Sequence, residues 1–352
     1  MSHAMSHAAA AAIAGPVSHR RLRSPRLGWG KTSQRRGRGP LHQGRIGLHQ
    51  GRVGLRVEAV SDEVETTTHT VPSGLKLEVL SRRASRDTPS GGDKPPMVFV
   101  HGSYHAAWCW SEHFFEFFAG KGYDCFAVSM RGQGGSDAPV DGGIPTLEDH
   151  AEDITHFCEA LASTHDRPPV LVGHSFGGLV AQFVTCQPSP PPLSGLVLLA
   201  SVPPSGNGEM VKRFLKRDLW ASVKITYAFI AGAFKTNAKL CRECFFSDDL
   251  PESTLVRHMG RIATSSQVRL LDLKALNASL PIPPPKPGSP PVCVVGGEDD
   301  FVVDVEGLRE TAVWAGNTSP VVLTATAHDA MLDTRWQGTA SALEGWMAAA
   351  GL

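Results

Sequence analysis

Residues 170–178 read VLVGHSFGG, in which a short apolar run leads directly into a serine flanked by glycines. The pattern is G-x-S-x-G, and an amphipathic stretch follows it over residues 178–186. A strand, a sharp turn and a helix form the context in which this motif presents a nucleophilic serine. Bulky neighbours would collide in so tight a turn, which explains the glycines. We therefore expect Ser175 to be lifted above the sheet edge, with free N–H groups of the next helix pointing at it.

A second apolar run, residues 97–100, ends in HGSYHAAW at 101–108. Ester cleavage passes through a tetrahedral intermediate with a negative oxygen, and two backbone N–H groups must already point at that oxygen. One is the N–H of the residue after the nucleophile, here Phe176, and the other comes from a loop after an earlier strand. The segment 101–108 has the right place in the chain for that second loop.

Two further motifs follow late apolar runs. Residues 292–295 lead into GGEDDFVV at 296–303, and residues 321–323 precede AHDAMLD at 327–333. A serine nucleophile needs a histidine as general base and a carboxylate that fixes the histidine's tautomer and stabilises the imidazolium. His328 is the only histidine after residue 258, so it is the expected base.

From about residue 75 onward, these motifs make the chain resemble the serine hydrolases of the α/β-hydrolase fold. The chain order Ser, Asp, His is the order of that fold. The family has His-Gly-x in the early loop, which implies that Ser103 supplies the second N–H of the oxyanion hole. Its G-x-x-D-x-x-V pattern aligns with residues 297–303 and implies Asp300 as the acid, with Asp299 and Glu298 as alternatives.

The loop H-G-x-x-H-x-x-W-x-W at 101–110 is also similar to the plant methylesterase and hydroxynitrile lyase branch of that family. In R-G-Q-G-G-S at 131–136, Gln133 stands where the family usually has histidine. We interpret that loop as structural. His101 is interpreted as a residue that pins its loop by hydrogen bonds.

Strand-like apolar runs alternate with helix-like stretches, which predicts a parallel sheet with right-handed crossovers. The resemblance implies the α/β class and the α/β-hydrolase fold: a mostly parallel central sheet flanked by helices, with an inserted helical cap. We expect residues 60–204 and 282–352 to form the core. Residues 205–281 read as helical, contain no strand-like run and are rich in large apolar side chains, so they form the expected cap.

The resemblance places the cap over the serine, where it shapes the substrate pocket. From the cap we expect Trp220, Tyr227 and Phe234 to bind substrate, and from the early loop His105 and Trp108. Packing within the core is the alternative for each of these side chains. The apolar cap favours a hydrophobic substrate, either a small-molecule or a lipid ester.

The amino-terminal segment differs from the rest in charge. Residues 1–57 hold 11 of the 34 Lys and Arg side chains and no Asp or Glu. A segment rich in Arg and Ala and free of acids is typical of organelle transit peptides. Leu55–Ala59 is similar to chloroplast processing sites, so we expect residues 1–59 to be a disordered transit peptide for the chloroplast, with the mitochondrion as second choice. A nucleic-acid-binding arm is disfavoured because the basic residues lack interleaved aromatics.

No stretch reaches the roughly 18 apolar residues that a membrane span requires. The seven cysteines are an odd number and lie mostly in apolar runs, which favours buried thiols over a disulfide framework. Cys241 and Cys244 form a lone C-x-x-C, which cannot complete a zinc site, and a redox switch is the alternative to two core cysteines. No cofactor or metal is implied, and the oligomeric state is not indicated.

The sequence thus predicts a carboxylic ester hydrolase with a catalytic triad. Ser175 would attack the carbonyl, His328 would take its proton and Asp300 would orient His328. The alternatives are a thioesterase or acyltransferase, a lyase that uses the same triad as a base, and a member of the fold that acts only by binding a ligand, because fold alone does not decide function.

Overall fold

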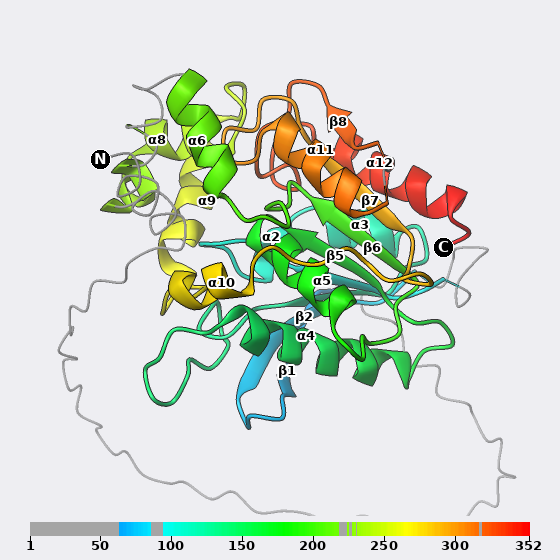
Figure 1. Ribbon diagram of the computed structural model, residues 1–352. Coiled ribbons are helices and arrows are strands. Elements are labelled where there is room, and N and C mark those ends of the chain that lie inside the picture. The colour runs from blue at the N-terminus through cyan, green and yellow to red at the C-terminus, as the bar shows by residue number, and fades with distance from the viewer. Residues whose placement is uncertain (1–62, 86–93, 218–223, 225–226, 230, 317–318) are drawn as a thin grey trace, which may run out of the picture. The chain divides into compact units, whose positions relative to one another are not determined.

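The computed structural model describes residues 63–85, 94–217, 224, 227–229, 231–316 and 319–352 (Figure 1). The expected transit peptide and Trp220 lie outside these residues. In the described part, eight strands form one sheet in the order β1-β2-β4-β3-β5-β6-β7-β8. The strands are β1 (Glu65–Thr70), β2 (Lys76–Arg82), β3 (Met97–Val100), β4 (Cys125–Val128), β5 (Val170–His174), β6 (Gly195–Leu199), β7 (Val292–Gly297) and β8 (Val321–Leu323).

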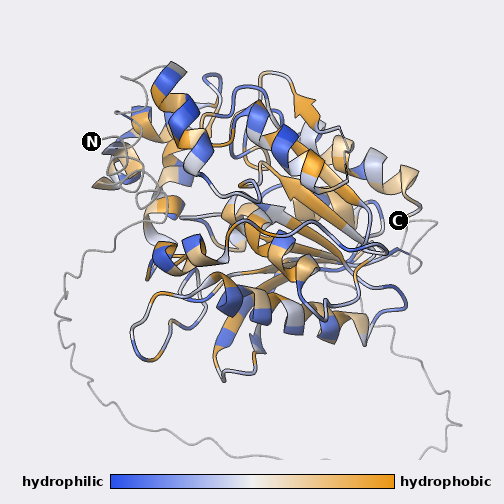
Figure 2. Cartoon of the chain, viewed as in Figure 1, coloured by the Kyte–Doolittle hydropathy of each residue, from blue (hydrophilic) through white to orange (hydrophobic). Residues whose placement is uncertain are grey.

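Strand direction confirms the predicted fold class. β1 and β2 pair antiparallel, as do β2 and β4. Every pair from β4 through β8 is parallel. Strands β3 to β7 are fully buried, as expected for parallel strands covered by helices on both faces. Figure 2 shows these central strands as hydrophobic, while the outer turns of α6 and α11 are hydrophilic.

The helices are α2 (Trp108–Ser111), α3 (Phe114–Ala119), α4 (Leu147–Ala162), α5 (Phe176–Cys186), α6 (Gly208–Arg217), α8 (Ala238–Phe245), α9 (Glu252–Thr264), α10 (Leu273–Ser279), α11 (Val305–Trp314) and α12 (Trp336–Ala349), with the 3-10 turn η1 (Ala233–Lys235). Thr146 caps α4, and Asp149 completes a capping box. Helix α11, capped by Asp304, was not predicted.

Sheet register decides which helices cover which face. Phe99 of β3 packs its ring against three phenylalanines of α3. Gly195, which lies on the same face by register, is covered by Trp346 of α12. Gly296 of β7 lies on the opposite face and meets Leu308 of α11. α3 and α12 therefore cover one face, and α11 covers the other together with the contacting pair α4 and α5 (Figure 1).

Residues 108–119 form two short helices with a break between them. α2 ends at Ser111 and α3 begins at Phe114, because His113 has a φ of −141° and leaves the helical conformation. The His113 ring instead stacks flat on Trp336 of α12, with centroids 4.6 Å apart. The contact between the two helices therefore takes precedence over a continuous local helix.

Between β6 and β7, the described residues form helices and no strand, as predicted. α6 docks on the loop that precedes α11. Arg213 binds both carboxylate oxygens of Asp304, at 2.8 and 2.6 Å. Phe214 stacks on Phe301 with centroids 5.1 Å apart.

α9 docks on the other side of this insertion, against α2. Glu112 receives hydrogen bonds from Arg257 and Arg261 of α9. Trp108 of α2 donates its Nε1–H to Ser265 Oγ at 2.9 Å. The insertion is therefore fixed to the sheet domain at two separate places. Among the described residues, no helix has the length and apolar character needed to span a bilayer.

Candidate active site

Ser175 lies in the turn between β5 and α5, with φ 54° and ψ −121°. Residues with a Cβ rarely adopt this conformation, which stores strain. Steric contacts explain why glycine stands on both sides of Ser175. A Cβ on Gly173 would lie 2.5 Å from the oxygen of Gly177, and one on Gly177 would lie 2.3 Å from the oxygen of His101. The turn therefore holds the serine in a fixed, tightly packed position.

The loop after β3 lies directly against this turn. A Cβ on Gly102 would lie 2.7 Å from the Cβ of Ser175, so only glycine permits this approach. Ser103 follows in that loop. Phe176 is the first residue of α5, so its N–H has no partner within the helix. The two N–H groups expected in the oxyanion hole thus come from two segments that touch at Ser175.

His101 holds the base of the same loop. Its Nε2 accepts the N–H of Met130 at 3.0 Å, and its Nδ1 lies 2.8 Å from the oxygen of Gly102. Because a carbonyl only accepts, Nδ1 carries the proton. Burial lowers the pKa of His101 to about 3, so the ring is neutral. These are the hydrogen bonds expected of a residue that pins the loop.

His328 and Asp300 come from neighbouring loops, after β8 and β7. Nδ1 of His328 lies 2.8 Å from Oδ2 of Asp300. The other oxygen, Oδ1, accepts the N–H groups of Val302 and Val303 at 2.7 and 2.8 Å. Both oxygens of Asp300 are therefore engaged, and one of them holds the imidazole.

The electrostatic surroundings favour a protonated His328. Burial alone would lower the pKa of His328, but the charge of Asp300 and its hydrogen bond raise it above the usual value, with a smaller contribution from Asp329. A histidine in these surroundings is a stronger base than a free imidazole. The alternative acids Glu298 and Asp299 are both exposed, whereas Asp300 is buried.

Ser175 and His328 line one cavity of about 10 Å³, which is room for a single water molecule. The other lining residues are Ser103, Tyr104, His105, His174, Phe229, Phe245 and Val302. Ser103 Oγ is buried and has no hydrogen-bond partner in the described part of the chain. The expected nucleophile and base therefore face aromatic side chains and the hydroxyl of Ser103.

Of the expected substrate-binding residues, His105 lines this cavity. Trp108 lies behind it, stacked on the His105 ring with centroids 5.7 Å apart. Phe234 is fully buried and packs edge-on against Tyr104 at 4.7 Å, also behind the cavity wall.

Tyr227 is 61% exposed and is not among the residues that line this cavity, so its expected role in binding substrate stays a prediction. The next two residues, Ala228 and Phe229, are the buried ones, so the helical turn points Tyr227 outward. Trp220 lies outside the described residues. Five further residues of the cavity were not predicted, namely Tyr104, His174, Phe229, Phe245 and Val302. Tyr104 and Val302 lie inside quoted motifs and could have been found, whereas no motif marks the two phenylalanines.

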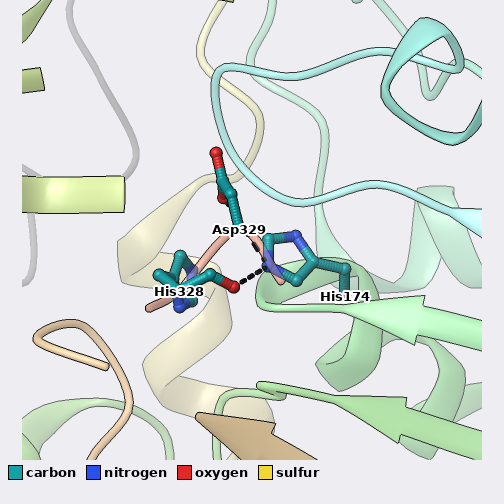
Figure 3. Close-up of side chains that lie close together, drawn as sticks. All are labelled: His174, His328 and Asp329. Atoms are coloured by element: carbon teal, nitrogen blue, oxygen red, sulfur yellow. Dashed lines mark hydrogen bonds and ion pairs between the residues drawn. The ribbon is translucent and has the colours of Figure 1, made fainter. Parts of the chain in front are cut away.

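Figure 3 shows a group of three buried side chains that includes the expected base, namely His174, His328 and Asp329. Their ligand-type atoms lie within 4.8 Å of one another. However, His174 Nε2 donates to the oxygen of His328 at 3.1 Å, and His328 Nδ1 is bonded to Asp300. Since these nitrogens already bond to the protein, the arrangement is explained without a metal.

A larger cleft of about 510 Å³ lies on the outer side of the cavity wall. Three pairs of chain neighbours form this wall. Phe245, Val302 and His328 line the cavity, whereas Phe246, Phe301 and Ala327 line the cleft. The remaining cleft residues are Lys224, Glu243, Ser247, Asp248, Asp249, Asp299, Ala325 and Arg335. The cleft is therefore adjacent to the cavity that Ser175 and His328 line.

The predicted cysteine environment is confirmed for the C-x-x-C segment. Cys241 and Cys244 are free thiols, and both are buried in α8. Burial raises the pKa of the Cys241 thiol to about 12. A buried, protonated thiol reacts poorly with oxidants. The pair therefore behaves as part of the hydrophobic core.

Residues 97–342 match the model of a family described as alpha/beta hydrolase family. Methylesterase 1 of Arabidopsis thaliana is 38% identical over 86 residues, which are 24% of this chain and 32% of that protein. Putative methylesterase 13, chloroplastic, of the same plant is 33% identical over 88 residues, 25% of this chain and 19% of that protein. The chain thus spans about a third or less of the length of these two relatives. A putative aryl esterase from Burkholderia cenocepacia has the same fold, with a TM-score of 0.57 at 19% identity, covering 81% of this chain and 99% of that one.

Proposed function

Because the chain belongs to the alpha/beta hydrolase family, we propose that it is a serine hydrolase that cleaves a carboxylic ester through an acyl-enzyme. The observation that carries this proposal is the shared cavity of Ser175 and His328, with Asp300 bonded to the far side of the imidazole. A member that only binds ligands would not need this arrangement, nor a strained serine.

In the proposed reaction, Ser175 Oγ attacks the ester carbonyl and His328 Nε2 takes the hydroxyl proton. The N–H groups of Ser103 and Phe176 stabilise the negative oxygen. His328 then gives the proton to the departing alcohol, which leaves an acyl group on Ser175. A water molecule loses a proton to His328 and attacks this acyl group, releasing the acid and restoring the serine.

We propose a small-molecule or lipid ester as substrate, with residues 205–281 acting as a cap. Relatives are named methylesterases, which favours a small alcohol as one product. The small aromatic cavity favours a short acyl group, and the cleft beyond Phe246 and Phe301 suits the rest of the molecule. The cleft is lined by four carboxylates and two cations, so it favours neutral or cationic esters over anionic ones.

A fluorophosphonate probe tests the proposal, because it reacts covalently with activated serines. We expect label on the peptide that contains Ser175, and none in the Ser175→Ala variant. A panel of acetyl to decanoyl esters, with and without an acceptor alcohol, then separates hydrolysis from acyl transfer. Absence of label, or label at another residue, would contradict a working nucleophile at Ser175.

We further propose that residues 1–59 direct the protein to the chloroplast and are removed near Ala59, with the mitochondrion as the alternative. The acid-free basic composition supports this, and two relatives carry the word chloroplastic in their names. Sequencing the amino terminus of the protein isolated from its own cells is the test. Abundant peptides from residues 1–50 would contradict it.

A further inference from the structure

His105 lines the cavity and is joined to Asp329 behind it, and no step of the proposed reaction uses either side chain directly. Nε2 of His105 lies 2.9 Å from Oδ2 of Asp329. Both side chains are buried, with exposures of 1% and 0%. We call these two residues the buried pair. We infer that the buried pair is an ion pair that positions the oxyanion loop against the loop of His328. This role rests on the proposed function, because it concerns the same reaction.

The hydrogen bonds of His105 indicate its charge. Nδ1 lies 2.9 Å from the oxygen of Ser103, and a carbonyl only accepts, so Nδ1 carries a proton. A second proton lies between Nε2 and Asp329. Burial would raise the pKa of Asp329, but the charge and hydrogen bond of His105, with His174 and His328, lower it. Asp329 is therefore a carboxylate, and because a carboxylate only accepts, Nε2 of His105 donates to it.

The His105 side of the buried pair fixes the oxyanion loop. The loop closes on itself through the His105 N–H, which donates to the oxygen of Gly102 at 3.4 Å. Between them, Tyr104 has a φ of 67°, which is strained for a residue with a Cβ. Such strain persists only where surrounding contacts hold it. The His105 bond to Ser103 supplies that hold next to the N–H that would bind the oxyanion.

The Asp329 side fixes the loop of the proposed base. Asp329 directly follows His328, and its N–H donates to the oxygen of Phe245 at 2.9 Å. Its second oxygen, Oδ1, lies 3.8 Å from Nε2 of His174. That same His174 nitrogen donates to the oxygen of His328. The buried pair therefore ties together the oxyanion loop, the end of β5, the base loop and α8.

The buried pair is surrounded by histidine and cysteine side chains. His101 interacts with it from the loop after β3, His174 from β5, His328 from the base loop and His258 from α9. Three thiols face it from α2 and α8, namely Cys109, Cys241 and Cys244. Burial raises the pKa of each thiol and lowers the pKa of His174 and His258, so these groups are neutral. Asp329 and Asp300 are thus the charges that favour protonation of His328.

The first test concerns charge and needs no activity. His105→Gln leaves Asp329 as a buried carboxylate without its cation, whereas adding Asp329→Asn removes that charge. We expect the single variant His105→Gln to have a lower Tm than the double variant. An equal or higher Tm for the single variant would overturn the ion pair.

The second test concerns the reaction and uses Asp329→Asn, which keeps the shape of the side chain. We expect kcat for a small ester to fall about 10- to 100-fold with little change in KM, because misplaced groups weaken transition-state stabilisation. Loss of a negative charge near His328 should also shift the acidic limb of the kcat/KM profile to lower pH, by more than about half a unit. A purely structural residue would move Tm but not this limb.

Asp333→Asn is the matched control. Asp333 is also a buried acid of the same loop, but it accepts hydrogen bonds from Ser247 and Thr334, outside the reactive cavity. We expect this variant to lose Tm but to keep the wild-type pH profile. The positioning role would be overturned if Asp329→Asn kept the wild-type kcat and the wild-type acidic limb of the kcat/KM profile. It would also be overturned if Asp329→Asn and Asp333→Asn changed kcat and this limb equally. If the wild-type protein hydrolyses no ester, the proposed function fails, while the Tm comparison still decides on the ion pair.

Discussion

Asp299 and Asp300 are neighbours in the chain with opposite surroundings. Asp300 accepts two backbone N–H groups through one oxygen and faces His328 through the other. Asp299 is exposed and lines the outer cleft. The two N–H groups fix the direction in which the other oxygen of Asp300 points. A carboxylate held in this way can orient an imidazole, whereas a solvated one cannot.

We predict that Asp300→Asn lowers kcat by about 10⁴, because the amide favours the wrong tautomer of His328. Asp299→Asn removes the same charge from the same loop and should change kcat less than about threefold. Steady-state kinetics on one activated ester measure both variants. A larger loss in Asp299→Asn than in Asp300→Asn would mean that the acid has been misassigned.

At the scale of elements, the features that could be predicted from the sequence are the turns and loops that depend on local steric contacts. G-x-S-x-G and His-Gly-x identify a turn and a loop because only glycine fits beside Ser175, and that constraint is visible in the residues themselves. The division of the helix at His113 depends on Trp336, more than 200 residues away in the chain, and no local pattern contains it. The same holds for the insertion, where Phe229 and not Tyr227 lines the cavity because of how its helices dock.

The end of α8 places two adjacent phenylalanines on opposite sides of the cavity wall. Phe245 is the last helical residue, and Phe246 is extended, with φ −128° and ψ 153°. This change of backbone sends Phe245 into the cavity beside His328 and Phe246 into a stack on His258. The side chain of Phe245 therefore limits the space next to Ser175, whereas the side chain of Phe246 does not.

We predict that the intact protein prefers acetyl over hexanoyl esters of one alcohol, because the cavity has room for little more than a water molecule. Phe245→Ala should raise the ratio of kcat/KM for hexanoyl over acetyl at least about tenfold, through burial of the added methylenes. Phe246→Ala is the control, with the same loss of volume on the other side, and should change the ratio less than about twofold. Equal shifts in both variants would show that Phe245 does not limit the acyl group.

At the scale of the whole molecule, several histidines are buried without charge. Burial lowers the pKa of His101 to about 3 and those of His150 and His258 to about 4. Each stays neutral in the folded protein while it takes up a proton in the unfolded chain below about pH 6.5. Their contribution to stability is therefore complete above that pH and is lost as the pH falls toward 4. His165, whose pKa is raised by Asp124, acts in the opposite sense.

We predict a lower free energy of unfolding at pH 5.0 than at pH 7.5, with about 2 kcal/mol lost for a fully buried ring such as His150. Denaturant titrations at both pH values measure the difference. His258→Phe is the informative variant, because the ring lies between Trp108 and Phe246 and neither ring nitrogen has a partner in the described part of the chain. This substitution should reduce the difference in the free energy of unfolding between the two pH values. An unchanged or larger difference would contradict the proposal that His258 is neutral in the folded protein.

The left-handed backbone of Ser175 has a consequence for how this protein can evolve and be engineered. Strain at a residue with a Cβ costs on the order of 1–3 kcal/mol, and glycine adopts the same angles freely. We therefore predict that Ser175→Gly raises Tm although it abolishes activity, while Ser175→Ala, which keeps the Cβ, is equally inactive and leaves Tm near the wild-type value. Equal Tm values for the two variants would contradict this. If this prediction holds, the folded protein is more stable without its nucleophile than with it. Selection for stability alone would then replace Ser175, so the serine is maintained only by selection for the reaction.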